Sequence, residues 1–121
     1  MINVKDKVYQ ALCTVATNVS DIYPQDWETM PAIQYTEEAN NVITKTDDEE
    51  QMSELRYRVD IWNTGSTSQL AIAVDEALSA LGLTRTECMD VQDPSYRRHK
   101  QMRYTGVIDN TDEHVYWEYN Q

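Results

Sequence analysis

The segment from Leu55 to Gly82, LRYRVDIWNTGSTSQLAIAVDEALSALG, constrains the fold more than any other part of the chain. Its first half alternates apolar and polar side chains, which predicts a half-buried strand with one apolar face. The apolar members of this strand are Leu55, Tyr57, Val59 and Ile61. Its second half repeats apolar side chains at three- and four-residue spacing, which predicts an amphipathic helix. The apolar stripe of that helix comprises Leu70, Val74, Ala77, Leu78 and Leu81.

Residues typical of helix boundaries lie at both ends of this helix. Thr64-Gly65 supplies a turn after the strand, and Ser66 followed by Gln69 has the spacing of a capping box. Gly82 follows the last apolar position, where a left-handed C-terminal cap favours a residue without a Cβ atom. A corner this short folds the apolar stripe back onto the strand. The segment therefore predicts how the core is built but carries no visible chemistry.

The composition narrows the class of protein. A chain of 121 residues predicts one domain over 1–121, and its net charge of −11 argues against a sequence-reading nucleic-acid binder. Cys13 and Cys88 are too far apart for a zinc motif or a disulfide framework, so we expect reduced core cysteines in a cytosolic protein. The N-terminal residues lack an apolar run, and no stretch approaches membrane-spanning length. We therefore expect a soluble protein that does not bind membranes.

Periodicity along the rest of the chain predicts a first helix over Asn3–Val19 and then a loop over Asp21–Pro31. The aromatic side chains of that loop are either a packing plug or a ligand-stacking site, and packing is the commoner role. Strands are expected at Ala32–Thr36, Val42–Thr44, Met52–Asn63, Leu83–Val91, Gln101–Asp109 and His114–Tyr119. The predicted fold class is α+β, with a mixed, mainly antiparallel sheet of four to five strands and two helices packed on one face. The expected order is α-β-β-β-α-β-β-β.

Two charged segments stand out. The acidic run Asp47-Asp48-Glu49-Glu50 must be solvated and is expected at an exposed hairpin tip. It lacks the alternating ligands and central glycine of a calcium loop, so we expect no metal there. The segment Arg97-Arg98-His99-Lys100 holds three of the ten basic residues. It either balances acids within the chain or meets an acidic surface on a neighbouring subunit.

Catalytic motifs do not emerge from the sequence. No glycine-rich phosphate loop, CxxC, HExxH or GxSxG pattern is present. His99 and His114 lie near no nucleophile in a recognisable motif, and 21 acidic residues make accidental carboxylate pairs inevitable. We therefore expect a protein that is not an enzyme, with no catalytic, cofactor-binding or metal-binding residues.

Several short sequence segments, together with the order of elements, resemble those of the tail-completion proteins of long-tailed bacteriophages, which include tail terminators and tail-to-head joining proteins. The segments are VYQAL, MPAIQYTEEAN, RYRVDIW leading into AIAVDEAL, and LTRTECMDVQDP followed by HKQMRYTGVID. The resemblance covers residues 8 to 109. It implies a hexameric ring that ends tail-tube polymerisation, with the tail tube protein and the head connector or stopper protein as partners. It also implies a structural, non-enzymatic protein of the virion neck, assembled in the host bacterial cytoplasm, with DNA only as passing cargo.

A ring uses heterologous contacts, in which one patch meets a different patch on the next copy. The acidic run and the basic segment are candidate opposite patches, and an exposed Trp62 with Tyr116 and Trp117 could supply aromatic anchors. The candidate interface residues are Asp47, Asp48, Glu49, Glu50, Arg56, Arg58, Trp62, Arg97, Arg98, Lys100, Tyr116 and Trp117. The alternative is a small non-viral α+β adaptor domain that binds proteins.

Overall fold

The structure is a computed structural model that describes residues 3–46, 49–109 and 114–116, with only the backbone described for 44–46, 49–51 and 114–116. Its elements are α1 (Lys5–Leu12), β1 (Asn18–Ser20), β2 (Ala32–Thr46), β3 (Glu49–Asn63), α2 (Ser68–Ser79), β4 (Thr84–Val91), β5 (Arg98–Asp109) and β6 (His114–Tyr116). The α+β class and the element order predicted from the sequence are confirmed.

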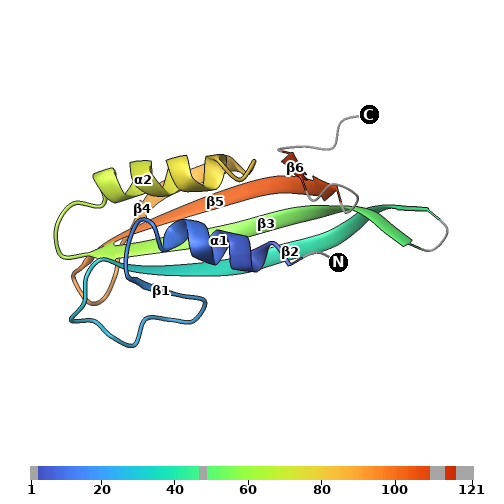
Figure 1. Ribbon diagram of the computed structural model, residues 1–121. Coiled ribbons are helices and arrows are strands. Elements are labelled where there is room, and N and C mark those ends of the chain that lie inside the picture. Colours follow the sequence, from blue (N-terminus) through green and yellow to red (C-terminus); the bar gives the residue numbers. More distant parts are fainter. Residues whose placement is uncertain (1–2, 47–48, 110–113, 117–121) are drawn as a thin grey trace.

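One mixed sheet of six strands holds the molecule together (Figure 1). The strand order is β1-β2-β3-β5-β4, and β6 pairs with β5. The β1–β2 pair is parallel, and every other pair is antiparallel. The main path of the sheet holds five strands, as the predicted four to five allows, and the three-residue β6 extends β5 off that path.

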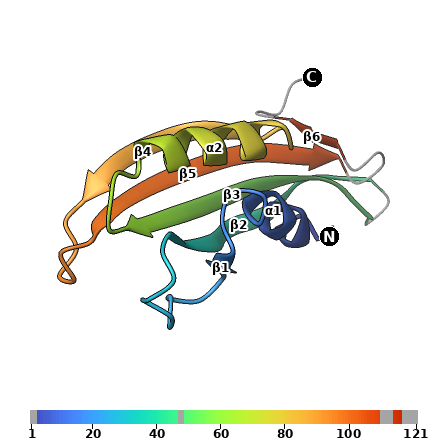
Figure 2. The same ribbon diagram turned by 60° about the vertical axis from the view of Figure 1, so that its left-hand side comes forward.

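Both helices cover the same face of the sheet, and Figure 2 shows the opposite face free of helices. The core lies between the helices and that face, because alternate residues of each strand point to one side. All four apolar residues predicted on β3 are fully buried there. They pack with the apolar side chains Val4, Val8, Leu12, Ile33, Tyr35, Ala71, Val74, Leu78, Leu83, Met102, Tyr104 and Ile108.

The first helix is shorter than the expected Asn3–Val19, since α1 ends at Leu12. After a turn the chain enters β1, where Val19 lies opposite Ile33 of β2. Val15 and Val19 still pack against the core, so their apolar spacing was real although it does not mark a helix. At the start of α1, the Asp6 backbone N–H donates to Asn3 Oδ1 at 3.3 Å.

The strand predictions at Ala32–Thr36 and Val42–Thr44 belong to one continuous strand, β2. Irregular register between Glu37 and Ala39 and again near Thr44 interrupts its alternation, which explains why the sequence divided it. The β2–β3 hairpin continues beyond both helices (Figure 1), so one end of each of its long strands protrudes. Thr46 pairs with Glu49 at the end of this hairpin, whereas Asp47 and Asp48 lie outside the described residues.

The helix α2 begins at Ser68 with Thr67 as its N-cap, one residue later than a Ser66 cap predicts. The Ser66 hydroxyl nevertheless accepts the Ser68 backbone N–H at 3.1 Å. The expected glycine cap is confirmed, since Gly82 has a φ of 96°. One prediction about the core is wrong: Cys13 and Cys88 are both free and exposed, because Cys13 follows the last residue of α1 and Cys88 lies on the edge strand β4.

Candidate functional site

The helix-free face of the sheet carries the polar residues that alternate with the core. On β3 these are Arg58, Asp60 and Trp62, which lie opposite Arg103, Gln101 and His99 of β5. The register therefore brings together residues about 40 positions apart in the sequence. These six residues with Glu38, Glu87 and Asp93 are here called the polar face.

Carboxylates hold the two arginines of this face in place. Arg58 and Arg103 lie directly opposite each other, where like charges repel. Glu38 lies between them, with Oε1 at 3.1 Å from Arg103 Nε and Oε2 at 3.7 Å from Arg58 Nη1. Glu87 of β4 adds a contact of 3.1 Å to Arg103 Nη1. Each arginine is thus neutralised within the chain, which leaves neither free for an acidic partner. The hydrogen bond to Glu38 also raises the pKa of Arg103 above its ordinary value.

Asp60 lies two residues after Arg58 on the same face of β3, where its carboxylate contacts three side chains. Its side chain is 4% exposed, and it accepts hydrogen bonds from Arg58 Nε at 3.0 Å and Gln101 Nε2 at 3.1 Å. His99 Nε2 lies 2.8 Å from the same carboxylate. A buried carboxylate is costly unless it is paired and hydrogen-bonded, and Asp60 meets both conditions. It serves to position the strands rather than to present a charge.

Trp62 corrects a prediction, because it is 3% exposed and not an accessible aromatic anchor. Its ring stacks on the His99 ring with centroids 4.4 Å apart, and its Nε1–H donates to Asp93 Oδ1 at 3.0 Å. The sequence placed it on the outer face correctly but could not show that the turn following β4 covers it. Burial alone would raise the pKa of Asp93, but hydrogen bonds from Ser95 and Trp62 outweigh that effect and hold the pKa below its ordinary value.

The His99, Asp93 and Ser95 side chains do not form a catalytic triad. The Ser95 hydroxyl donates to Asp93 Oδ2, and His99 Nδ1 lies 3.6 Å from Asp93 Oδ1. Nucleophilic catalysis needs the histidine beside the hydroxyl, with the carboxylate behind the histidine. Here the carboxylate lies between the other two groups, so this cluster fastens the turn after β4 to the sheet.

Two loops meet at this end of the sheet. Tyr23 and Trp27 from the loop between β1 and β2 pack on Trp62, with ring centroids 5.7 and 5.5 Å from it. The Arg97 guanidinium lies 5.1 Å from the Trp27 ring centroid, and its Nη2 donates to the Trp27 carbonyl oxygen at 3.4 Å. The packing interpretation of these aromatics is thus supported, and Arg97 is part of the packing.

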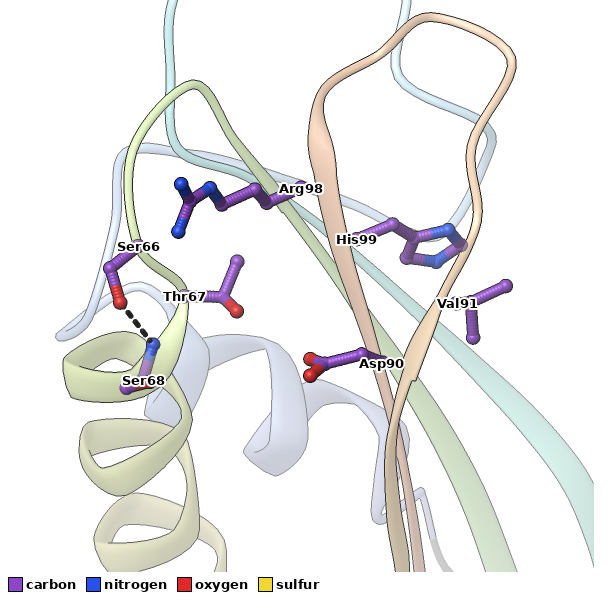
Figure 3. Close-up of a pocket in the computed structure, with 7 residues that line it drawn as sticks. All are labelled: Ser66, Thr67, Ser68, Asp90, Val91, Arg98 and His99. Carbon is purple, nitrogen blue, oxygen red and sulfur yellow. Dashed lines mark hydrogen bonds between the residues drawn. The ribbon is translucent and has the colours of Figure 1, made fainter.

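The rest of the basic segment divides between pairing and exposure. Lys100 pairs with Asp90 of β4 at 3.0 Å. Arg98 is exposed, and no ion pair joins it to another described residue. Its guanidinium points toward Ser66 and Thr67 at the start of α2, on the other side of the strand from the His99 ring (Figure 3). These residues border an open pocket of about 300 Å³.

The remaining predicted interface residues do not join the polar face. Arg56 is half exposed and lies 3.6 Å from Glu54 on the same strand. Tyr116 belongs to β6, of which only the backbone is described, and Trp117 lies outside the described residues, as Asp47 and Asp48 do. Sequence reasoning missed Glu38, Glu87, Asp93 and Arg103. The alternation of side chains along β5 could have placed Arg103 on the outer face, but no local signal pairs it with Glu38.

The described residues offer neither a metal-binding cluster nor a membrane-spanning helix. Among them, no group of three or more His, Cys, Asp or Glu side chains is arranged to hold a metal ion. In the same residues, no helix has both the length and the apolar character needed to cross a membrane.

Comparison with known proteins adds no assignment. Neither the protein-family models nor the curated proteins contain a match to this chain.

Proposed function

We propose that this chain is a structural protein of a bacteriophage neck, which assembles with copies of itself into a ring that caps the tail tube and joins it to the head connector. The resemblance of residues 8 to 109 to tail-completion proteins supplies the hypothesis. The observed order of elements agrees with the order on which that resemblance rests, including the long hairpin before the strand–turn–helix segment.

The observation that carries the proposal is the separation of charge along the sheet. The basic segment begins at the Asn63 end of β3, since Asn63 pairs with Arg98. Glu49 and Glu50, the last two residues of the acidic run, begin β3 at the opposite end of the same strand. At about 3.3 Å per residue, the 14 residues between these positions span about 45 Å. That distance exceeds the Debye length of about 8 Å at physiological salt several-fold, so the two segments cannot neutralise each other within one chain.

Opposite charges at opposite ends of a molecule suit a heterologous contact between copies. When one end of a copy meets the other end of the next, the contacts continue until the rotation closes a ring. Burial of a few charged pairs would also align the copies, since electrostatic complementarity fixes the register of an interface. A protein built to bind itself in this way needs no catalytic group, and its function would lie in its surfaces.

Charge reversal at Arg98 tests the proposal. Arg98 is the suitable position because its side chain is exposed, whereas Arg97 packs on Trp27 and its loss would disturb the fold. We expect size-exclusion chromatography with light scattering to show a closed oligomer for the wild type and a shift toward monomer for Arg98→Glu. Lys7→Glu on α1 makes the same change in charge away from both ends of the sheet and should leave assembly intact.

The same samples distinguish the alternative function. A wild-type chain that stays monomeric at high concentration and does not sediment with purified tail tubes would contradict the neck proposal. That result would favour the small protein-binding adaptor. Circular dichroism of Arg98→Glu must match the wild type, because unfolding would show that this arginine is needed for the fold and not for assembly.

A further inference from the structure

The start of α2 leaves backbone hydrogen-bond donors without acceptors. The first bond within the helix is accepted by the Thr67 carbonyl oxygen, so the N–H groups of the next three residues have no acceptor inside the helix. The Ser66 hydroxyl accepts the Ser68 N–H at 3.1 Å, whereas no side chain of the described residues accepts those of Gln69 and Leu70. The first turn of α2 holds no acidic residue to offset the positive end of the helix dipole. This end of the helix therefore favours an anion.

The Thr67 side chain supplies a further unused donor. Thr67 is 5% exposed, yet its hydroxyl forms no hydrogen bond with any described residue. In Figure 3 the hydroxyl points away from α2, into the space between Arg98 and Asp90. A hydroxyl that is buried without a partner destabilises the folded chain, so its position favours a ligand that accepts a hydrogen bond from it.

Arg98 brings a full positive charge to the same place. It is exposed and unpaired among the described residues, and its guanidinium points toward Ser66 and Thr67 (Figure 3). Asp90 also lines the pocket, but Lys100 lies 3.0 Å from its carboxylate and offsets its charge. The guanidinium, the hydroxyl and the free N–H groups thus border one open pocket of about 300 Å³.

We infer that this pocket binds phosphate, as the free ion or as the phosphate group of a small molecule, through Arg98, the Thr67 hydroxyl and the two free N–H groups of α2. A guanidinium binds phosphate oxygens in pairs, and the remaining oxygens can accept from the other donors. The net charge of −11 repels a polyanion such as DNA, which favours a small ligand. The inference goes beyond the ring proposed above and does not depend on it.

Isothermal titration calorimetry with inorganic phosphate, at an ionic strength held constant with sodium chloride, tests the site. We expect saturable binding with a Kd of about 1 mM, which Arg98→Gln should weaken about tenfold because it removes a charge-assisted contact. The matched control is Arg56→Gln, which should bind phosphate as the wild type does. Arg56 lies on β3 seven residues before Asn63, the partner of Arg98, and is therefore about 23 Å away.

Two further variants separate the site from the general charge of the chain. Thr67→Val keeps the shape of the side chain and should weaken phosphate binding about fivefold. In phosphate-free buffer it should melt at or above the wild-type temperature, because no hydrogen bond of the described chain is lost. Asp90→Asn removes the carboxylate from the pocket and should strengthen phosphate binding about twofold to fivefold.

Failure of the wild type to bind phosphate saturably, or equal affinities of Arg98→Gln and the wild type, would overturn the inference. A lower melting temperature of Thr67→Val with unchanged phosphate affinity would also overturn it, because the hydroxyl would then serve the fold. Titration with glycerol phosphate distinguishes the source: tighter binding than inorganic phosphate assigns an ester, and weaker binding assigns the free ion. A short DNA duplex that displaces phosphate at a lower concentration would contradict a small ligand.

Discussion

Tyr57 of β3 and Tyr104 of β5 lie opposite each other in the core, yet their hydroxyl groups have different surroundings. Tyr104 donates to Asp75 Oδ1 of α2 at 2.9 Å. The buried Tyr57 hydroxyl lies near Glu37 but meets the geometry of a hydrogen bond with none of the described residues. Burial raises the pKa of both phenols, with Glu37 adding to the effect at Tyr57 and Asp75 at Tyr104. Both are therefore neutral at physiological pH.

This difference gives a matched pair of variants. Tyr104→Phe should lower the free energy of unfolding by about 1–1.5 kcal/mol, because it removes a hydrogen bond. Tyr57→Phe should change it by less than about 0.5 kcal/mol or increase it, since an unpaired hydroxyl is costly to bury. Urea denaturation of both variants measures the difference. Equal losses would mean that the Tyr57 hydroxyl is paired in solution.

Asp93 should make stability depend on acid pH. Its pKa is lower in the folded chain than in the unfolded chain, so the folded state favours the ionised form. The resulting stabilisation is present above about pH 4, the unfolded value, and is lost as the pH falls through the folded pKa. Asp93→Asn should therefore lower the melting temperature at pH 7 and flatten its decrease toward pH 3. An unchanged acid dependence in the variant would assign that effect to other carboxylates.

At the scale of the element, the end of α2 is specified by one residue. The Gly82 N–H bonds the Ser79 carbonyl oxygen at 2.9 Å, and the Leu83 N–H bonds that of Leu78 at 3.3 Å. This pair of bonds is the Schellman motif, which needs a left-handed residue at the position of Gly82. The chain is then directed into β4 with Leu83 buried.

Gly82→Ala should consequently lower the free energy of unfolding by about 1–2 kcal/mol, because alanine is strained at a φ of 96°. Thermal denaturation checks this expectation. Gly65→Ala is the control, because Gly65 does not have a positive φ and an added Cβ would meet its nearest atom, Asn63 Nδ2, at 3.8 Å. Comparable losses in the two variants would show that strain at Gly82 is not the cause.

Elements with regular periodicity were predictable, whereas those defined by distant partners were not. Strand β3 and helix α2 were found because every second or every third to fourth residue is apolar. The single strand β2 was divided by its irregular register, and β1 was assigned to a helix because Val15 and Val19 continue the helical spacing. Only the parallel pairing of Val19 with Ile33 makes β1 a strand, and no residue near Val19 specifies that pairing.

For the whole molecule, the separation of charge along the sheet predicts salt-sensitive assembly. Raising the ionic strength from 0.1 M to 1 M shortens the Debye length from about 10 Å to about 3 Å, which weakens attraction between exposed charges. Self-association of the wild type should therefore weaken at 1 M salt, and Arg98→Glu should show a smaller dependence. Sedimentation at both salt concentrations measures it. Stronger association at 1 M would indicate that apolar contacts dominate instead.

The sequence by itself determined the fold class, the buried side of β3, the cap at Gly82 and the position of the long hairpin. Each of these depends on periodicity or on backbone conformation within a few residues. Only the tertiary structure decided which outer-face residues are accessible. Trp62 is buried and Arg97 is packed because the turn after β4 and the loop after β1 reach them from distant parts of the chain. Asp60 is buried against His99 and Gln101 of β5, which are also distant in sequence. Strand pairing is non-local, so local spacing gives the face of a side chain but not the segment that covers it.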